Sequence, residues 1–187
     1  MNTLQAEVKN CHKCGEREKL SCKLMKEGNC RIIVIGESPA KDGWVVSGKA
    51  FYNTDGKLQA SGKVLDKLLR LCGLSIDDIY FTEACKCIIS DRNKLSECAN
   101  NCKPILFKQL EECDCDIILT MGQCPTEVIL GERVKKLKDF VGRKYSVKFG
   151  EKIKTVVPIF HTSPISPLSF KGNEPIFRDI ISKLVKE

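Results

Sequence analysis

Short runs of consecutive apolar residues alternate along this chain with segments in which apolar residues recur every three or four positions. The runs predict four buried strands, within residues 31–38, 79–87, 116–122 and 154–161. Helical spacing predicts helices over residues 61–73, 97–111, 124–130 and 174–186. Ser61 is a candidate N-cap of the first of these helices, and Gly73 is a candidate stop signal. Strands that alternate with helices predict a three-layer α/β/α sandwich around a mainly parallel, four-stranded sheet.

The remaining segments fit a single domain over residues 1–187. Residues 1–30 form a polar lead-in that carries cysteines, and residues 132–153 are basic and punctuated by glycine, which predicts a hairpin or an irregular excursion. Ligands of such sheets bind beyond the carboxyl ends of the strands. Three predicted strands end in unusual polar sequences, GESPA, TEACKC and HTSP. We therefore expect a functional site where these three loops meet.

Composition narrows the class of protein. The start of the sequence has no apolar core of a signal peptide, and no later run reaches the ~18 apolar residues of a membrane span. We therefore expect a cytoplasmic, monomeric protein with no membrane partner. Twelve cysteines in such a chain indicate metal or cluster ligation rather than a disulfide framework. The net charge of +7 is compatible with a polyanionic partner such as DNA, although charge alone does not establish one.

Cys11 and Cys14 form a C-x-x-C pair, whose spacing lets two thiolates converge on one metal centre. Two more ligands are needed. Cys87, after the second predicted strand, and Cys102, in the following helix, are candidates among several other cysteines, and composition does not choose between them. An iron-sulfur cluster and a zinc ion are both compatible with a set of four thiolates.

The motifs taken together resemble those of family 4 uracil-DNA glycosylases. The similarity lies in CHKC, Lys86-Cys87 and NCKP, in GESPAKD followed by GKAF, and in the histidine that begins HTSPIS, a loop similar also to that of family 1 enzymes. The resemblance covers nearly the whole chain in the same order. It implies cleavage of the N-glycosidic bond of a flipped, deaminated base in single- or double-stranded DNA, with uracil as the first candidate.

The resemblance also implies roles for individual residues. Carboxylates stabilise an oxocarbenium-like sugar and hold a water molecule, while a histidine donates a hydrogen bond to the base as negative charge develops. The implied catalytic residues are Glu37, Asp42 and His161. The implied base-binding residues are Gly36, Ser38, Phe51 and Glu83, with Phe51 as the stacking platform. The implied DNA-binding residues are Ser163, which contacts a phosphate, Ile165, the apolar wedge, and Ser166.

The implied metal centre is a structural four-iron, four-sulfur cluster on Cys11, Cys14, Cys87 and Cys102, with a zinc ion as the alternative. Ordinary roles remain open for other residues: Phe51 and His161 can be core residues, and Glu37 a solvated acid. The basic residues from Arg133 to Lys154 can flank a DNA channel or face solvent.

The match departs from the family at Glu83, where the family has an asparagine that reads the edge of uracil. An amide donates to O4 and accepts from N3–H, whereas a carboxylate only accepts and favours bases with an amino group. Uracil activity is therefore expected to be weakened or redirected, unless Glu83 is protonated in a dry pocket. Thr162 replaces the usual proline after the histidine. A non-catalytic DNA-damage-binding relative and a zinc-stabilised nucleotide-binding protein remain the alternatives.

Overall fold

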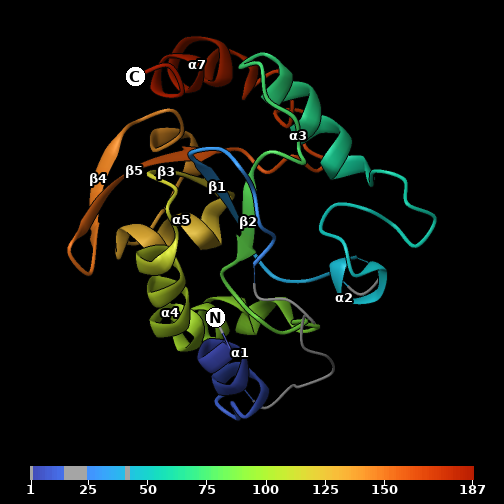
Figure 1. Cartoon of the computed structure of the whole chain (residues 1–187), viewed down its shortest axis with the longest axis vertical. Coiled ribbons are helices and arrows are strands. Elements are labelled where there is room, and N and C mark those ends of the chain that lie inside the picture. The colour runs from blue at the N-terminus through green and yellow to red at the C-terminus, as the bar shows by residue number, and fades with distance from the viewer. Residues whose placement is uncertain (1, 15–24, 41–42) are drawn as a thin grey trace.

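A five-stranded sheet forms the centre of the protein (Figure 1). The computed structural model describes residues 2–14, 25–40 and 43–187. The strand order is β2-β1-β3-β5-β4, and all neighbours are parallel except the β4–β5 pair at one edge. The strands are β1 (Ile32–Gly36), β2 (Tyr80–Glu83), β3 (Ile117–Met121), β4 (Tyr145–Phe149) and β5 (Lys152–Ile159).

The sheet therefore has five strands rather than the four predicted from the sequence. The additional strand, β4, forms a hairpin with β5, in which Tyr145 pairs with Val156 and Phe149 with Lys152. Its side chains alternate between partly buried and exposed until the buried Phe149. A continuous apolar run is the signal of a strand covered on both faces, and this edge strand has none. Residues 132–153 were expected to form a hairpin or an irregular excursion; they supply β4 and the turn to β5, and the second strand of the hairpin is β5 itself.

Helices cover both faces of the sheet. On one face, Ile32 and Val34 of β1 pack with α3 and the C-terminal helices, while Ile33 and Ile35 pack on the other face with α4 and α5 (Figure 1). This alternation along one strand confirms the predicted three-layer α/β/α sandwich. The longer helices are α1 (Asn2–Lys9), α3 (Ala60–Arg70), α4 (Leu95–Glu112) and α5 (Gln123–Leu130). The shorter ones are α2 (Trp44–Ser47), η1 (Arg92–Lys94), η2 (Leu137–Asp139), α6 (Glu174–Ile176), η3 (Phe177–Ile181) and α7 (Ser182–Leu184).

The helix boundaries differ in detail from the sequence prediction. Gln59 rather than Ser61 is the N-cap of α3, so the prediction for Ser61 was wrong; Ser61 lies in the first turn of the helix. Gly73, with φ of +75°, lies three residues after the end of this helix, in agreement with its predicted role as a stop signal. The closing helix is continuous from α6 to α7, with the π-helical turn η3 between them.

Lys154, in the basic stretch, is a structural residue rather than a surface cation. Its side chain is 2% exposed, and its Nζ donates to the carbonyl oxygens of Cys113 at 2.7 Å and Cys115 at 2.6 Å. These bonds join β5 to the chain that follows α4. Lys154 therefore does not contribute to a DNA-binding surface, whereas Lys135, Lys136 and Lys152 are exposed.

Candidate functional site at the carboxyl ends of the strands

A cavity of about 410 Å³ opens where β1, β2, β3 and β5 end. Its lining comes from the loop after β1, the end of β2, the end of β3 and the residue after β5, together with residues of the segments 43–61 and 88–92. Among the residues predicted from the sequence, the cavity brings together Gly36, Glu37, Ser38, Phe51, Glu83 and His161. Segments far apart in the chain thus meet at one site, at the edge of the sheet where ligands of parallel sheets bind.

Glu37 is held at the cavity by hydrogen bonds of its own backbone and by an ion pair. Its carbonyl oxygen accepts from the N–H of Cys85 at 2.8 Å. Arg92, in η1, donates from Nη2 to Oε2 of Glu37 at 2.5 Å, and the Glu37 side chain is only 21% exposed. A hydrogen bond between charged groups fixes the orientation of the Glu37 carboxylate. Sequence reasoning missed Arg92, which is 55 residues from Glu37 and belongs to no motif.

His161 lies on the same side of the cavity as Glu37. A Cβ atom built on Gly122 would lie 3.4 Å from Oε1 of Glu37 and 3.7 Å from Cδ2 of His161. Gly122 has φ of +103°, a conformation in which a side chain is strained, so the backbone approaches both side chains without a Cβ. The carboxylate and the imidazole are therefore close neighbours.

The hydrogen bonding of His161 determines its tautomer. Nδ1 accepts from the N–H of Ser163 at 3.0 Å, so the proton of the neutral ring resides on Nε2. Burial lowers the pKa of His161 below its ordinary value; Glu37 opposes this shift and Arg92 adds to it. At neutral pH the ring is thus a neutral hydrogen-bond donor through Nε2.

Asn173 fixes the start of the loop that carries His161. Its Oδ1 accepts from the N–H of Phe160 at 2.9 Å, and its Nδ2 donates to the carbonyl oxygens of Phe160 at 2.9 Å and Ser169 at 2.8 Å. Asn173 is fully buried. One side chain therefore closes the loop from Phe160 to Ser169 and sets the backbone immediately before the histidine.

Phe51 forms an aromatic wall of the cavity. Its ring centroid lies 4.4 Å from that of Phe81, at an interplanar angle of 57°. Phe51 has φ of +69°, a strained conformation for an aromatic residue. Its carbonyl oxygen accepts from the N–H of Gln59 at 2.8 Å, and a Cβ atom on Gly62 would lie 2.9 Å from the Cβ of Phe51. Gly62 is thus required for α3 to pack against the strained residue.

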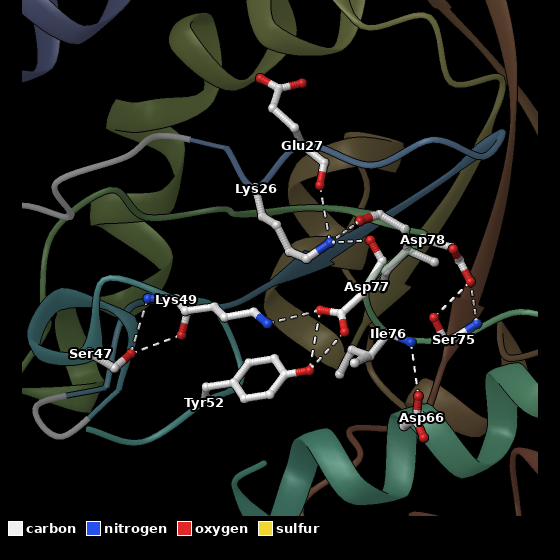
Figure 2. Close-up of polar contacts among 11 residues, drawn as sticks. Lys26, Glu27, Ser47, Lys49, Tyr52, Asp66, Ser75, Ile76, Asp77 and Asp78 are labelled. Atoms are coloured by element: carbon white, nitrogen blue, oxygen red, sulfur yellow. Dashed lines mark hydrogen bonds and ion pairs between the residues drawn. The ribbon is translucent and has the colours of Figure 1, made fainter. Parts of the chain in front are cut away.

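A polar network holds the segment around Phe51 against the turn before β2 (Figure 2). Asp77 forms an ion pair with Lys49 at 3.2 Å and accepts from the hydroxyl of Tyr52 at 3.0 Å. The Lys49 ammonium also lies 3.8 Å from the centroid of the Tyr52 ring. On the other side of the turn, Lys26 donates to the carbonyl oxygens of Glu27, Asp77 and Ile79. The residues on both sides of Phe51 are therefore anchored to the same turn.

Glu83 is the last residue of β2, paired with Gly36 of β1. It is 8% exposed and lines the cavity. Burial raises the pKa of its carboxyl group to about 8, and the nearby Lys86 opposes this shift. The burial that favours a protonated Glu83 is therefore present.

Three predicted DNA-binding residues lie beyond the cavity, on the loop after His161. Ile165 is 93% exposed, while Ser163 and Ser166 are partly buried and joined by a hydrogen bond from Ser166 N to Ser163 O at 3.0 Å. Thr162 is fully buried, and its hydroxyl donates to the sulfur of Met121. Asp42 lies outside the described residues.

A second, smaller site is formed by cysteines. The four predicted ligands, Cys11, Cys14, Cys87 and Cys102, line one cavity of about 20 Å³ between the end of α1, the loop after β2 and α4. Asn101 donates to the sulfur of Cys14 at 3.5 Å. In the described part of the chain, no three His, Cys, Asp or Glu side chains are grouped closely enough to hold a single metal ion. By donor type alone, four thiolates are the ligands of iron-sulfur clusters and of structural zinc.

The fold and the larger cavity define a three-layer α/β protein whose strand-end site combines an acid, an aromatic wall and a neutral histidine. The chain belongs to the uracil DNA glycosylase superfamily, whose family model matches residues 22–185. No helix among the described residues has the length and apolar character to span a membrane.

Three curated relatives are each named type-4 uracil-DNA glycosylase. The relative from Archaeoglobus fulgidus is 26% identical over 175 residues, which cover 88% of this chain and 82% of the relative. The relative from Saccharolobus solfataricus is 28% identical over 183 residues, 94% of this chain and 79% of the relative. The relative from Thermotoga maritima is 26% identical over 166 residues, 87% of this chain and 81% of the relative.

Proposed function

We propose that this protein is a DNA N-glycosylase that removes uracil from DNA by hydrolysis and leaves an abasic site. The observation that carries the proposal is the single cavity of about 410 Å³ lined by Glu37, Phe51 and His161. The names of the three curated relatives support the same activity. The reaction is hydrolytic and requires no change of redox state.

In the proposed mechanism, the uracil nucleotide leaves the base stack and enters the cavity, where its base stacks on Phe51. As the N-glycosidic bond breaks, negative charge develops on the base and positive charge on the sugar. His161 donates from Nε2 to the O2 oxygen of the base. A neutral donor suits this step, because its hydrogen bond to O2 becomes stronger as negative charge develops on the base. The enzyme then does not have to bury a cation before the reaction begins.

Glu37 supplies the opposite charge. Its carboxylate stabilises the cationic sugar and orients the attacking water on the face opposite the departing base. The ion pair with Arg92 holds the carboxylate in one orientation. We assign Asp42 to the same acidic side of the site from the sequence motif alone, and Gly36 and Ser38 to contacts with the base.

DNA binding is assigned to the loop after His161. Ile165 is exposed and apolar, as required of a side chain that fills the space left by a flipped nucleotide. Ser163 and Ser166 are placed on the same short loop and are proposed to contact the phosphates beside it. The chain is proposed to act on DNA as a monomer.

Cys11, Cys14, Cys87 and Cys102 are proposed to hold a four-iron, four-sulfur cluster, with zinc as the alternative. When bound, the cluster or the zinc ion would cross-link the chain and would take no part in the hydrolysis. The cysteines come from the segment after α1, from the loop after β2 and from α4, so they would attach residues 1–30 to the rest of a single domain.

The test is excision from oligonucleotides that contain one uracil, one hypoxanthine or one xanthine, each single-stranded and paired, followed by alkaline cleavage at abasic sites. We expect cleavage at uracil, and a loss of cleavage in Glu37→Gln. Binding to these strands without base release by folded wild-type protein would instead indicate the non-catalytic relative and would overturn the proposal.

A further inference from the structure

Among the residues that the structure describes, the carboxyl group of Glu83 has no hydrogen-bonding partner, although it is buried at the cavity of the candidate site. It is 8% exposed and lines the cavity beside Phe81 and Ile88. With the residues that the structure describes, its carboxyl oxygens form neither a hydrogen bond nor an ion pair. A buried carboxylate normally has such partners, because an unpaired buried charge is costly.

The charged groups around Glu83 do not neutralise it. Lys86, from the loop after β2, donates to Thr82 Oγ1 at 2.8 Å and to the main-chain oxygen of Glu83 at 2.6 Å, so it binds the backbone of Glu83 rather than its carboxyl group. Arg92, from η1, is paired with Glu37 of the loop after β1. His161, after β5, is neutral because burial lowers its pKa.

The protonation state follows from this environment. Burial raises the pKa of Glu83 to about 8, and the only opposing influence is the charge of Lys86. The raised pKa favours the neutral carboxylic acid at pH 7, with one O–H donor and one carbonyl acceptor. Burial also lowers the pKa of Lys86, to about 8.

We propose that Glu83 reads the edge of uracil as a neutral carboxylic acid, donating its O–H to O4 and accepting from N3–H. This proposal rests on the proposed function. A carboxylic acid presents one donor and one acceptor, as a carboxamide does, whereas a carboxylate would place a second acceptor against O4. Glu83 thereby replaces the asparagine expected at this position and makes base recognition dependent on one proton.

The test compares the pH dependence of kcat/KM for uracil excision in the wild type, Glu83→Gln and Glu132→Gln. Wild-type kcat/KM is expected to fall above about pH 8, by about tenfold per pH unit. Glu83→Gln, whose amide cannot ionise, is expected to lose this decline whatever its rate at pH 7. Glu132→Gln removes an exposed carboxylate outside the cavity and is expected to keep it. The range is kept below the pH at which uracil N3–H ionises.

Two results would overturn the proposal. Undiminished wild-type excision above pH 8 would show that ionised Glu83 is tolerated. A decline that persists in Glu83→Gln would belong to another group, such as Lys86. If no folded form releases uracil at any pH, the proposed function itself fails, which is distinguishable from either result.

Infrared spectroscopy of the wild type gives an independent measurement that does not depend on activity or on the folding of a variant. A carbonyl band of a protonated carboxylic acid is expected at pH 7 and is expected to titrate away near pH 8. Glu132→Gln should retain this band. Its absence from the wild type at pH 7 would refute the neutral acid.

Discussion

Replacement of Asn173 by alanine is expected to destabilise the protein and to impair catalysis together. Asn173→Ala removes three hydrogen bonds of 2.8–2.9 Å and leaves the N–H and C=O of Phe160 and the C=O of Ser169 without their partner. Each polar group left unpaired in the interior costs about 1–3 kcal/mol. Because Phe160 is only partly buried, we expect a total near the lower end, on the order of 3–5 kcal/mol.

For a chain of this size, such a loss corresponds to a decrease in Tm of about 6–20 °C, measurable by circular dichroism. Excision below the Tm should also fall, by about tenfold or more, because His161 follows Phe160 and its Nε2 would no longer be fixed. Asn100→Ala is the matched control: its amide makes one exposed bond within α4, and its effect should stay within about 0.5 kcal/mol. Equal Tm values and equal rates for the wild type and Asn173→Ala would refute the reasoning.

Three further predictions concern the two sites. His161→Ala should lower kcat by about 10²–10³-fold. The wild-type rate should decline in acid at a pH below the ordinary pKa of histidine, because burial lowers the pKa of His161, and the variant should lose this decline. An unchanged pH profile in the variant would contradict the assignment. Phe51→Ala should raise the Kd for DNA with a non-hydrolysable deoxyuridine analogue by about 10–100-fold, with little effect on undamaged DNA. Cys102→Ser should lose bound iron and sulfide and the visible absorption, whereas Cys72→Ser, on the opposite face of the sheet, should retain them; zinc in colourless wild-type protein would contradict the cluster.

The central parallel strands were predictable because they are covered on both faces and therefore appear as continuous apolar runs. The edge strand β4 was not, because YSVKF is half-exposed and lies in a basic, glycine-containing stretch. The burial of Lys154 was likewise hidden, since it depends on two carbonyl groups about forty residues earlier in the chain.

The candidate site likewise contains residues that sequence motifs predict and residues that they do not. The motifs around Glu37, Phe51, Glu83 and His161 mark residues that line one cavity, and their chemical roles remain predictions. Arg92 and Asn173 carry no local signal, because each acts through side-chain contacts with a distant or irregular segment. Protonation of Glu83 is not predictable from the sequence, because it depends on the burial of one side chain, which the sequence pattern does not reveal.

The weak packing of α1 against the rest of the protein favours local unfolding of this helix. Within the described residues, α1 contributes only Leu4 and Val8 to a small apolar cluster with Ile105, and Glu7 forms an exposed ion pair with Lys108. An apolar cluster of three side chains and an exposed ion pair supply little stability of their own. If the proposed metal centre on the cysteines is lost, the amide hydrogens of this first helix should exchange with solvent through local unfolding, while those of the central sheet stay protected. Proteases would then cleave the protein first near α1, before the central sheet becomes accessible to them.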